Sequence, residues 1–319
     1  MYRTLPRALL ALPLTLTAGA LVAGPPENPS APRDWDATAR FFATQDSNTP
    51  LAANGSGFME KTDGLSYGIA LNGSKDLYTA NRGWNLSAVG GVTRTFQNES
   101  VLRDFEMSAL SAGLAGRRNL NLGALPATAN VGYQAGYNWL GDSPYLMSHG
   151  LTGSLSTRLT SALRAGVSAG VTRSDFKNDG PQPDQSSMDS LGYNLGLNAE
   201  YAFNGGRQAI NAAIGHQDTN AEGSNFDLRG QTYSLGARTF IVIPWVLMVN
   251  ASHADSDYVS YNGVPQRSAT NDTLRVVMAG PVSRNWSADL SWQTSRYGSN
   301  LDDYKASRRL WAFGLAYKF

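Results

Sequence analysis

The chain alternates apolar and polar residues with a period of two along most of its length. In the segment 191–203, apolar and aromatic residues fill the odd positions, whereas Gly, Asn, Glu and Ala fill the even ones. The same alternation runs through 131–139, 163–171 and 286–293. Because successive side chains of a strand point to opposite faces, each segment predicts a strand with one apolar face and one polar or small face. Apolar residues at helical spacing are nearly absent, so the chain is predicted to be all-β.

About fourteen such segments follow one another from Trp35 to the C-terminus, each long enough for the roughly 9–11 residues of a tilted membrane-spanning strand. The segments near 36–43 and 105–114 are less regular, so the count could be twelve. The links between segments differ in length: short ones lie at 159–162, 204–206 and 280–283, and longer polar ones at 44–63, 175–187, 218–225, 255–267 and 295–307. Short turns at one end and long loops at the other predict a transmembrane antiparallel up-and-down β-barrel, with the long loops outside the cell.

The last nine residues give this pattern its clearest form. One face of this segment carries five large side chains: Trp311, Phe313, Leu315, Tyr317 and Phe319. The other face carries Ala312, Gly314, Ala316 and Lys318. A strand that faces lipid on one side and a small or wet interior on the other needs this arrangement.

A chain that stops on Phe after such a strand resembles Gram-negative outer-membrane β-barrels, whose C-terminal signature is read by the barrel-assembly machinery. The resemblance implies an assembly signal at Phe313, Leu315, Tyr317 and Phe319. It also implies that this machinery and the lipids of the outer membrane are partners.

The N-terminus predicts export. Arg3 and Arg7 precede an apolar run at 8–17 and the small residues Ala18-Gly19-Ala20, which is typical of a cleaved signal peptide at 1–20. A membrane anchor is the alternative, but the run is shorter than the ~20 residues that a spanning helix needs. A short periplasmic leader is expected at 21–34 and a single barrel domain at 35–319.

Composition narrows the class further. Only 16% of the residues are charged, whereas about 25% is usual for a soluble domain. Without the signal peptide, 26 − 2 = 24 Lys and Arg stand against 25 acids, and no basic tract suggests nucleic acid. The longest remaining apolar stretch, 241–249, contains Pro244 and is too short for a spanning helix, so a membrane protein would have to be a closed barrel. There is no Cys, so the chain has no thiolate site and no disulfide.

Tryptophan positions support a barrel over a soluble β-sandwich or propeller. Four are expected at periplasmic strand starts: Trp35, Trp84, Trp245 and Trp286. Three are expected at the outer rim: Trp139, Trp292 and Trp311. Aromatic rings prefer the two membrane interfaces, and a soluble fold gives no reason for such bands.

The strand parity predicts which charges face the interior. The basic ones are Arg40, Arg158, Arg164, Arg238 and Arg275, and the acidic ones are Asp36, Glu200 and Asp289. One interpretation is that these charges pair and brace the lumen. The other is that they line a hydrated passage with a mild preference for anions, and the two can coexist.

Other chemistry is weakly indicated. The three histidines, His149, His216 and His253, share parity with lipid-facing neighbours and fall on strands six, nine and eleven, which are not adjacent. No nucleophile elbow or supported carboxylate pair accompanies them, so an enzyme, metal site or cofactor is not expected. Acidic loop residues could bind Ca²⁺ but lack the spacing of a defined calcium loop: Asp179, Asp184, Asp189, Asp255 and Asp257.

The final hairpin, 297–319, resembles the barrel of the surface lipoprotein assembly modifier family, which also has fourteen strands. That family carries a periplasmic helical repeat domain, which 25–33 cannot supply. We therefore expect an outer-membrane barrel that forms a pore or translocation conduit through a polar, mildly Arg-rich lumen. The alternatives are a structural barrel whose extracellular loops bind a surface partner, and a lipid-acting outer-membrane hydrolase. A protein partner in the periplasm or at the cell surface is compatible with these interpretations.

Overall fold

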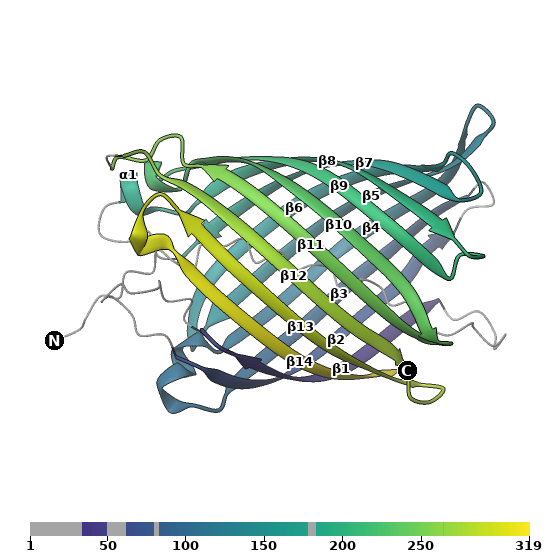
Figure 1. Cartoon of the computed structure of the whole chain (residues 1–319), viewed down its shortest axis with the longest axis horizontal. Coiled ribbons are helices and arrows are strands. Elements are labelled where there is room, and N and C mark those ends of the chain that lie inside the picture. The colour runs from purple at the N-terminus through teal and green to yellow at the C-terminus, as the bar shows by residue number, and fades with distance from the viewer. Residues whose placement is uncertain (1–33, 50–61, 80–82, 178–182, 264) are drawn as a thin grey trace.

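In a computed structural model, fourteen strands form one closed antiparallel barrel (Figure 1). The structure describes residues 34–49, 62–79, 83–177, 183–263 and 265–319. The predicted signal peptide and nearly all of the predicted leader lie outside these residues. The all-β class, the antiparallel order and the count of fourteen strands are confirmed.

Each strand pairs with its neighbours in sequence, and β1 pairs with β14 to close the ring. The strands are β1 (Trp35–Asp46), β2 (Gly64–Thr79), β3 (Trp84–Gln97), β4 (Met107–Leu122), β5 (Leu125–Leu140), β6 (Ser143–Arg158), β7 (Leu163–Phe176), β8 (Ser190–Phe203), β9 (Gln208–Ala221), β10 (Leu228–Val242), β11 (Trp245–Asp257), β12 (Ser268–Pro281), β13 (Trp286–Ser299) and β14 (Ala306–Lys318). Closure gives every strand a partner on both sides, so no strand edge is left unpaired.

The irregular alternation of the first predicted strand has a local cause. Phe42 lies on the same face of β1 as Arg40, where the other strands carry mainly small or polar residues. Its ring covers Gly68 of β2, and a Cβ on Gly68 would lie only 2.7 Å from Phe42 Cε1. The missing side chain of Gly68 therefore makes room for an aromatic ring on the inner face. The ring interrupts the alternation of apolar and polar residues, but β1 continues through it.

The two ends of the barrel differ. Turns next to the C-terminal end of β14 are short, such as 123–124, 204–207 and 243–244. The opposite end, on the left in Figure 1, carries the longer links and their short helices: η2 (Ser100–Phe105), α1 (Pro183–Ser186), η3 (Ser224–Phe226) and η4 (Asp302–Tyr304). We call this end the long-loop end. One link there, 141–142, is a tight turn in which Gly141 has a φ of +57°, a conformation that suits glycine.

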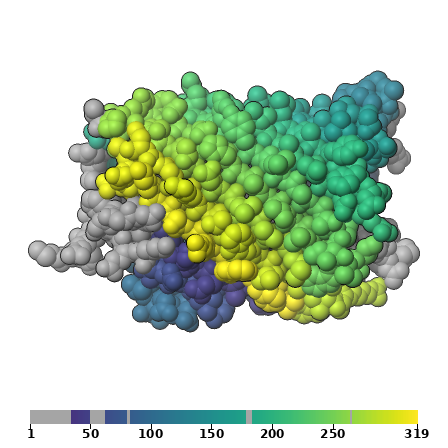
Figure 2. All heavy atoms as spheres, viewed as in Figure 1, coloured from purple at the N-terminus to yellow at the C-terminus, as the bar shows by residue number. Residues whose placement is uncertain are grey.

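No helix in the described ranges is both long and apolar enough to cross a membrane. The wall is a single layer, so large apolar side chains on its outer face have nothing over them. Leu195 is 55% exposed and Leu235 is 59% exposed, although both lie in the middle of paired strands. Figure 2 shows this outer surface over the later strands, with no helix covering it.

Candidate functional site: charges on the inner face of the barrel

The register assigns a face to every strand residue, because directly opposed residues of neighbouring strands point to the same side. Phe313 lies opposite Leu290 on the exposed apolar face, whereas Gly314 lies opposite Asp289 on the other face, which points into the barrel. Following the register around the ring puts the eight charges predicted for the interior on this inner face: Asp36, Arg40, Arg158, Arg164, Glu200, Arg238, Arg275 and Asp289.

Arg40 and Asp289 form an ion pair across the strand that closes the barrel. Arg40 Nη2 donates hydrogen bonds of 2.8 and 3.0 Å to the two carboxylate oxygens of Asp289. The pair reaches from β1 to β13 over Gly314 of β14, where a Cβ would lie 2.6 Å from Arg40 Nη2. The guanidinium also lies 5.5 Å from the centre of the Phe42 ring. Glycine at 314 therefore leaves the space in which the ion pair between β1 and β13 forms.

A second pair spans one strand in the same way. Arg238 Nη2 of β10 lies 3.9 Å from Glu200 Oε1 of β8, across β9. The register position between them on β9 is near Ala209, which is only 3% exposed and leaves space for the longer side chains. This pair is looser than the first, since its N–O separation is 3.9 Å against 2.8 Å for Arg40 and Asp289.

Glu200 stands in a patch with more positive than negative charge. Arg164 lies directly opposite Glu200, and Arg158 lies directly opposite Arg164. Like charges at opposed positions repel each other, and neither Arg158 nor Arg164 forms an ion pair with a described carboxylate. One carboxylate and three guanidinium groups thus lie in this part of the inner face, which gives it a net positive charge.

Arg275 is also without a described acidic partner. Its opposed residues are Asn250 and Gln293, which are polar but uncharged. Sequence reasoning missed a similar residue, Arg117, which lies opposite Asn130 on the inner face of β4. The parity of β4 would have found it had the fourth strand been regular enough to assign.

Two further inner-face pairs were not predicted, one because β1 runs beyond its predicted end and the other because its two members were assigned to the inner face separately. Asp46, only 4% exposed, accepts a 2.9 Å hydrogen bond from Arg308 Nε, and this pair joins β1 to β14 near the long-loop end. Asp46 had been expected in a loop, but β1 continues through it. Lys318 Nζ lies 3.0 Å from Asp36 Oδ1 at the other end of the same two strands.

The tryptophans follow the prediction at some positions and depart from it at others. Four open their strands and Trp139 lies one residue before the end of β5. Trp292 and Trp311 lie near the middle of their strands instead, with their ring centres 6.3 Å apart. This corrects their expected place at a strand end: β13 and β14 extend well past them toward the long loops. Whether the seven rings mark membrane interfaces stays a prediction.

The histidines lie on the outer face and on separate strands, β6, β9 and β11. His149 Nδ1 is 2.8 Å from the Tyr133 hydroxyl, and His253 contacts the carboxylates of Asp272 at 2.7 Å and Asp255 at 3.0 Å. Within the described residues, none of the three shares a hydrogen bond with a Ser or Thr hydroxyl.

The acidic loop residues do not come together in the described part of the chain, where no group of three or more His, Asp or Glu could hold a metal ion. Asp189 accepts a hydrogen bond from the Phe176 amide, and Asp255 faces His253 from within β11 instead of lying in a loop. Asp179 lies outside the described residues.

Comparison with known proteins gives a barrel likeness and no family. No family model and no curated sequence matches the chain. Among solved structures, an anion-selective porin from Comamonas acidovorans is 10% identical with a TM-score of 0.47, over 89% of this chain and 98% of the porin. A bacterial polysaccharide outer membrane secretin is 10% identical with a TM-score of 0.49, over 89% of this chain and 98% of that chain. Salmonella typhi OmpF in complex with daunomycin is 9% identical with a TM-score of 0.48, over 89% of this chain and 97% of OmpF. These likenesses are too weak to assign an activity, so the function is argued from this chain's own residues.

Proposed function

We propose that this protein is an outer-membrane β-barrel that forms a pore or translocation conduit with a preference for anions. The observation that carries the proposal is the contrast between the two faces of the wall. The outer face exposes large apolar side chains, as a lipid-facing surface requires, and the inner face is small, polar and charged. Four inner-face arginines have no described acidic partner: Arg117, Arg158, Arg164 and Arg275.

Location in the outer membrane follows from the same contrast. Irregular backbone and open sheet edges are not stable in lipid, but a closed barrel satisfies all backbone groups of its strands. The long-loop end would face the outside of the cell, and the short turns near Phe319 would face the periplasm. A predicted signal peptide would bring the chain to that compartment.

Conductance of the refolded protein in a planar bilayer tests the proposal. We expect steady open conductance, with a reversal potential under a salt gradient that indicates anion preference. The double variant Arg158→Gln/Arg164→Gln should shift that potential toward the value for no preference, because it removes the like-charge pair from the inner face.

A matched control removes the same charge from the other face. Arg94 and Arg173 are exposed and lie on the outer face near the long-loop end. Arg94→Gln/Arg173→Gln should leave the reversal potential unchanged. An equal shift in both double variants, or cation preference in the wild type, would contradict a passage lined by the inner arginines.

A structural or interaction barrel is the second candidate, and one observation favours it. Loops at the long-loop end are joined to one another, as where Asn262 Nδ2 donates a 2.8 Å hydrogen bond to Ser224 Oγ of η3. Joined loops could present a fixed surface to a partner. A barrel that is folded but does not conduct would favour this candidate over the pore.

A further inference from the structure

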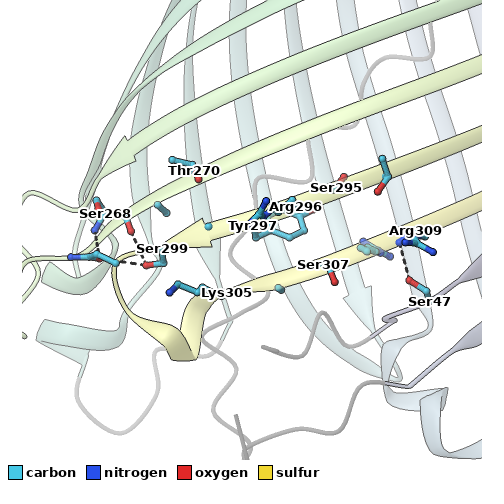
Figure 3. A pocket seen from close by; sticks show the side chains of 16 residues that line it. Ser47, Ser268, Thr270, Ser295, Arg296, Tyr297, Ser299, Lys305, Ser307 and Arg309 are labelled. Carbon is cyan, nitrogen blue, oxygen red and sulfur yellow. Dashed lines mark hydrogen bonds between the residues drawn. The ribbon is translucent and has the colours of Figure 1, made fainter. Parts of the chain in front are cut away.

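The outer surface of β12, β13 and β14 is hollowed near the long-loop end (Figure 3). The hollow has a volume of about 790 Å³. The register puts Thr270, Gly298 and Ser307 on the outer face there, next to Arg296 and Arg309. Small side chains in the wall between long ones explain the depression, since a Cβ on Gly298 would lie 2.5 Å from Thr270 Oγ1.

The hollow is cationic. Arg296 and Arg309 lie on adjacent strands, with Ser307 directly opposite Arg296. Both arginines are exposed, and neither forms an ion pair with a carboxylate in the described residues. Lys305 also borders the hollow, with its Nζ 2.6 Å from Asp302 in η4. Asp272, opposite Arg296, is bound instead to His253 at 2.7 Å.

An apolar surface begins directly below the cations, toward the middle of the wall. A second hollow, of about 530 Å³, shares Thr294 and Arg296 with the first. It is lined by Leu235 and Leu274, with the paired His253 and Asp272 beside them. On β14, Trp311 lies two residues below Arg309 on the same face. A molecule that occupied both hollows would meet positive charge near the rim and apolar side chains farther down.

We propose that this paired hollow binds the phosphate of an anionic membrane lipid, with Arg296 and Arg309 as its ligands and the acyl chains lying over Leu274 and Leu235. Guanidinium groups bind phosphate oxygens through paired charge-assisted hydrogen bonds. A soluble phosphate would use the cations but not the apolar hollow below them. The inference rests on the proposed location in the outer membrane, because the site faces lipid only there.

Native mass spectrometry of the full-length protein in detergent micelles tests the proposal. The probe is diphosphoryl lipid A, compared with the same lipid after removal of both phosphates. We expect the wild type to retain the phosphorylated probe, and Arg296→Gln/Arg309→Gln to retain at least fivefold less. Arg94→Gln/Arg173→Gln removes equal charge from the outer face of β3 and β7 and should retain as much as the wild type.

A second pair of variants keeps both arginines. Ser307→Glu adds a carboxylate between them and should reduce retention as strongly as the double substitution, whereas Ser307→Gln, of equal size, should not. Heat-modifiable migration on gels establishes that each variant is folded.

Three results would overturn the proposal: equal loss in the Arg94→Gln/Arg173→Gln control, equal retention of the dephosphorylated probe, or displacement of the lipid by millimolar inorganic phosphate. Displacement would assign the hollow to a free anion. Conductance of the same samples keeps the two proposals separate, because the hollow and the lumen lie on opposite faces of the wall. Loss of lipid with unchanged conductance is the expected outcome.

Discussion

At the residue scale, the Arg40–Asp289 pair neutralises charge on the inner face more than it stabilises the fold. Its side chains are 39% and 23% exposed, so solvent screens the attraction, and we expect Asp289→Asn to cost about 1 kcal/mol or less. The same substitution leaves the Arg40 charge uncompensated on the inner face. If the barrel conducts, reversal potentials of Asp289→Asn should therefore show stronger anion preference than those of the wild type.

The double variant Arg40→Gln/Asp289→Asn is the control for this prediction. It removes one charge of each sign, so the reversal potential should return close to the wild-type value. A loss of several kcal/mol in denaturant melts of Asp289→Asn would show instead that the pair is needed to hold β1 against β13.

The sequence placed both members of this pair on one face but could not bring them together. Parity within a strand follows from the alternation of side chains, so Arg40 and Asp289 could be assigned separately. Their contact depends on how β1, β13 and β14 are aligned, which no single strand determines. The role of Gly314 could not be predicted for the same reason, since the Arg40–Asp289 ion pair that needs its space comes from two other strands.

At the element scale, Arg267 joins two loops at the long-loop end. Its guanidinium carbon lies 3.8 Å from the ring centre of Tyr258 and 3.7 Å from that of Tyr304 in η4. Contacts of this kind contribute about 0.5–2 kcal/mol each. Arg267→Ala should thus release the loop after β11 and the loop after β13, seen as faster amide hydrogen exchange at Tyr258 and Tyr304.

Exchange within β11 and β13 should stay slow in Arg267→Ala, because the strand ladders do not depend on this contact. Arg284→Ala, in the short turn at the other end of the barrel, should leave both loops as they are in the wild type. Uniform acceleration across the strands would mean that the loops are needed for the stability of the whole barrel.

The same loop contact predicts an effect of alkaline pH. Burial raises the pKa of Tyr304 above its ordinary value, and the nearby Arg267 opposes this only in part. The folded state therefore keeps the phenol proton to higher pH than the unfolded state. The contribution of the protonated Tyr304 phenol to the stability of the loop is fully present below about pH 10, and it is lost as the pH rises through the folded-state pKa. Tyrosinate absorbance of the wild type minus that of Tyr304→Phe should reveal one late-titrating phenol.

In denaturant, the same difference spectrum should titrate at the ordinary pKa of tyrosine. A folded-state difference that titrates early would show that Arg267, and not burial, dominates at this phenol.

Element boundaries were the least predictable part of the fold. The segments at 36–43 and 105–114 looked irregular, yet the first lies within β1, and the second belongs to β4 from Met107 onward, after the end of η2. For β1 the cause is Phe42 on the inner face, in space left by Gly68 on the neighbouring strand β2, which the pattern within β1 alone does not show. The tight turn at 141–142 was also unexpected among the long links, because loop length at that end is not set by the barrel.

At the scale of the whole molecule, the sequence was sufficient for the architecture because one requirement repeats in every strand. A single-layer wall gives each strand one apolar and one polar or small face, and fourteen repetitions outweigh the irregular ones. The closure of β1 on β14 was implied by the absence of an edge in lipid, but their register had to come from the structure.

Phe319 allows assembly to be separated from stability. Its side chain is 50% exposed, its amide donates a 3.1 Å hydrogen bond to the Ala37 carbonyl, and its ring lies 5.0 Å from that of Tyr317. Phe319→Ser removes the ring contact but keeps the backbone bond, so the refolded barrel should lose only about 0.5–1.5 kcal/mol. If the last strand carries the assembly signal, the amount of heat-modifiable protein in the outer membrane should fall several-fold in cells.

Phe203→Ser is the matched control for this experiment. Phe203 also ends a strand at the short-turn end, is 37% exposed and stacks with its neighbour Tyr201, with ring centres 6.2 Å apart. It should lose similar stability in detergent but assemble normally, because β8 is an interior strand of the chain. Equal assembly defects in the two variants would assign the effect to the lost aromatic contact. Normal assembly of Phe319→Ser would contradict an assembly signal that depends on the C-terminal Phe.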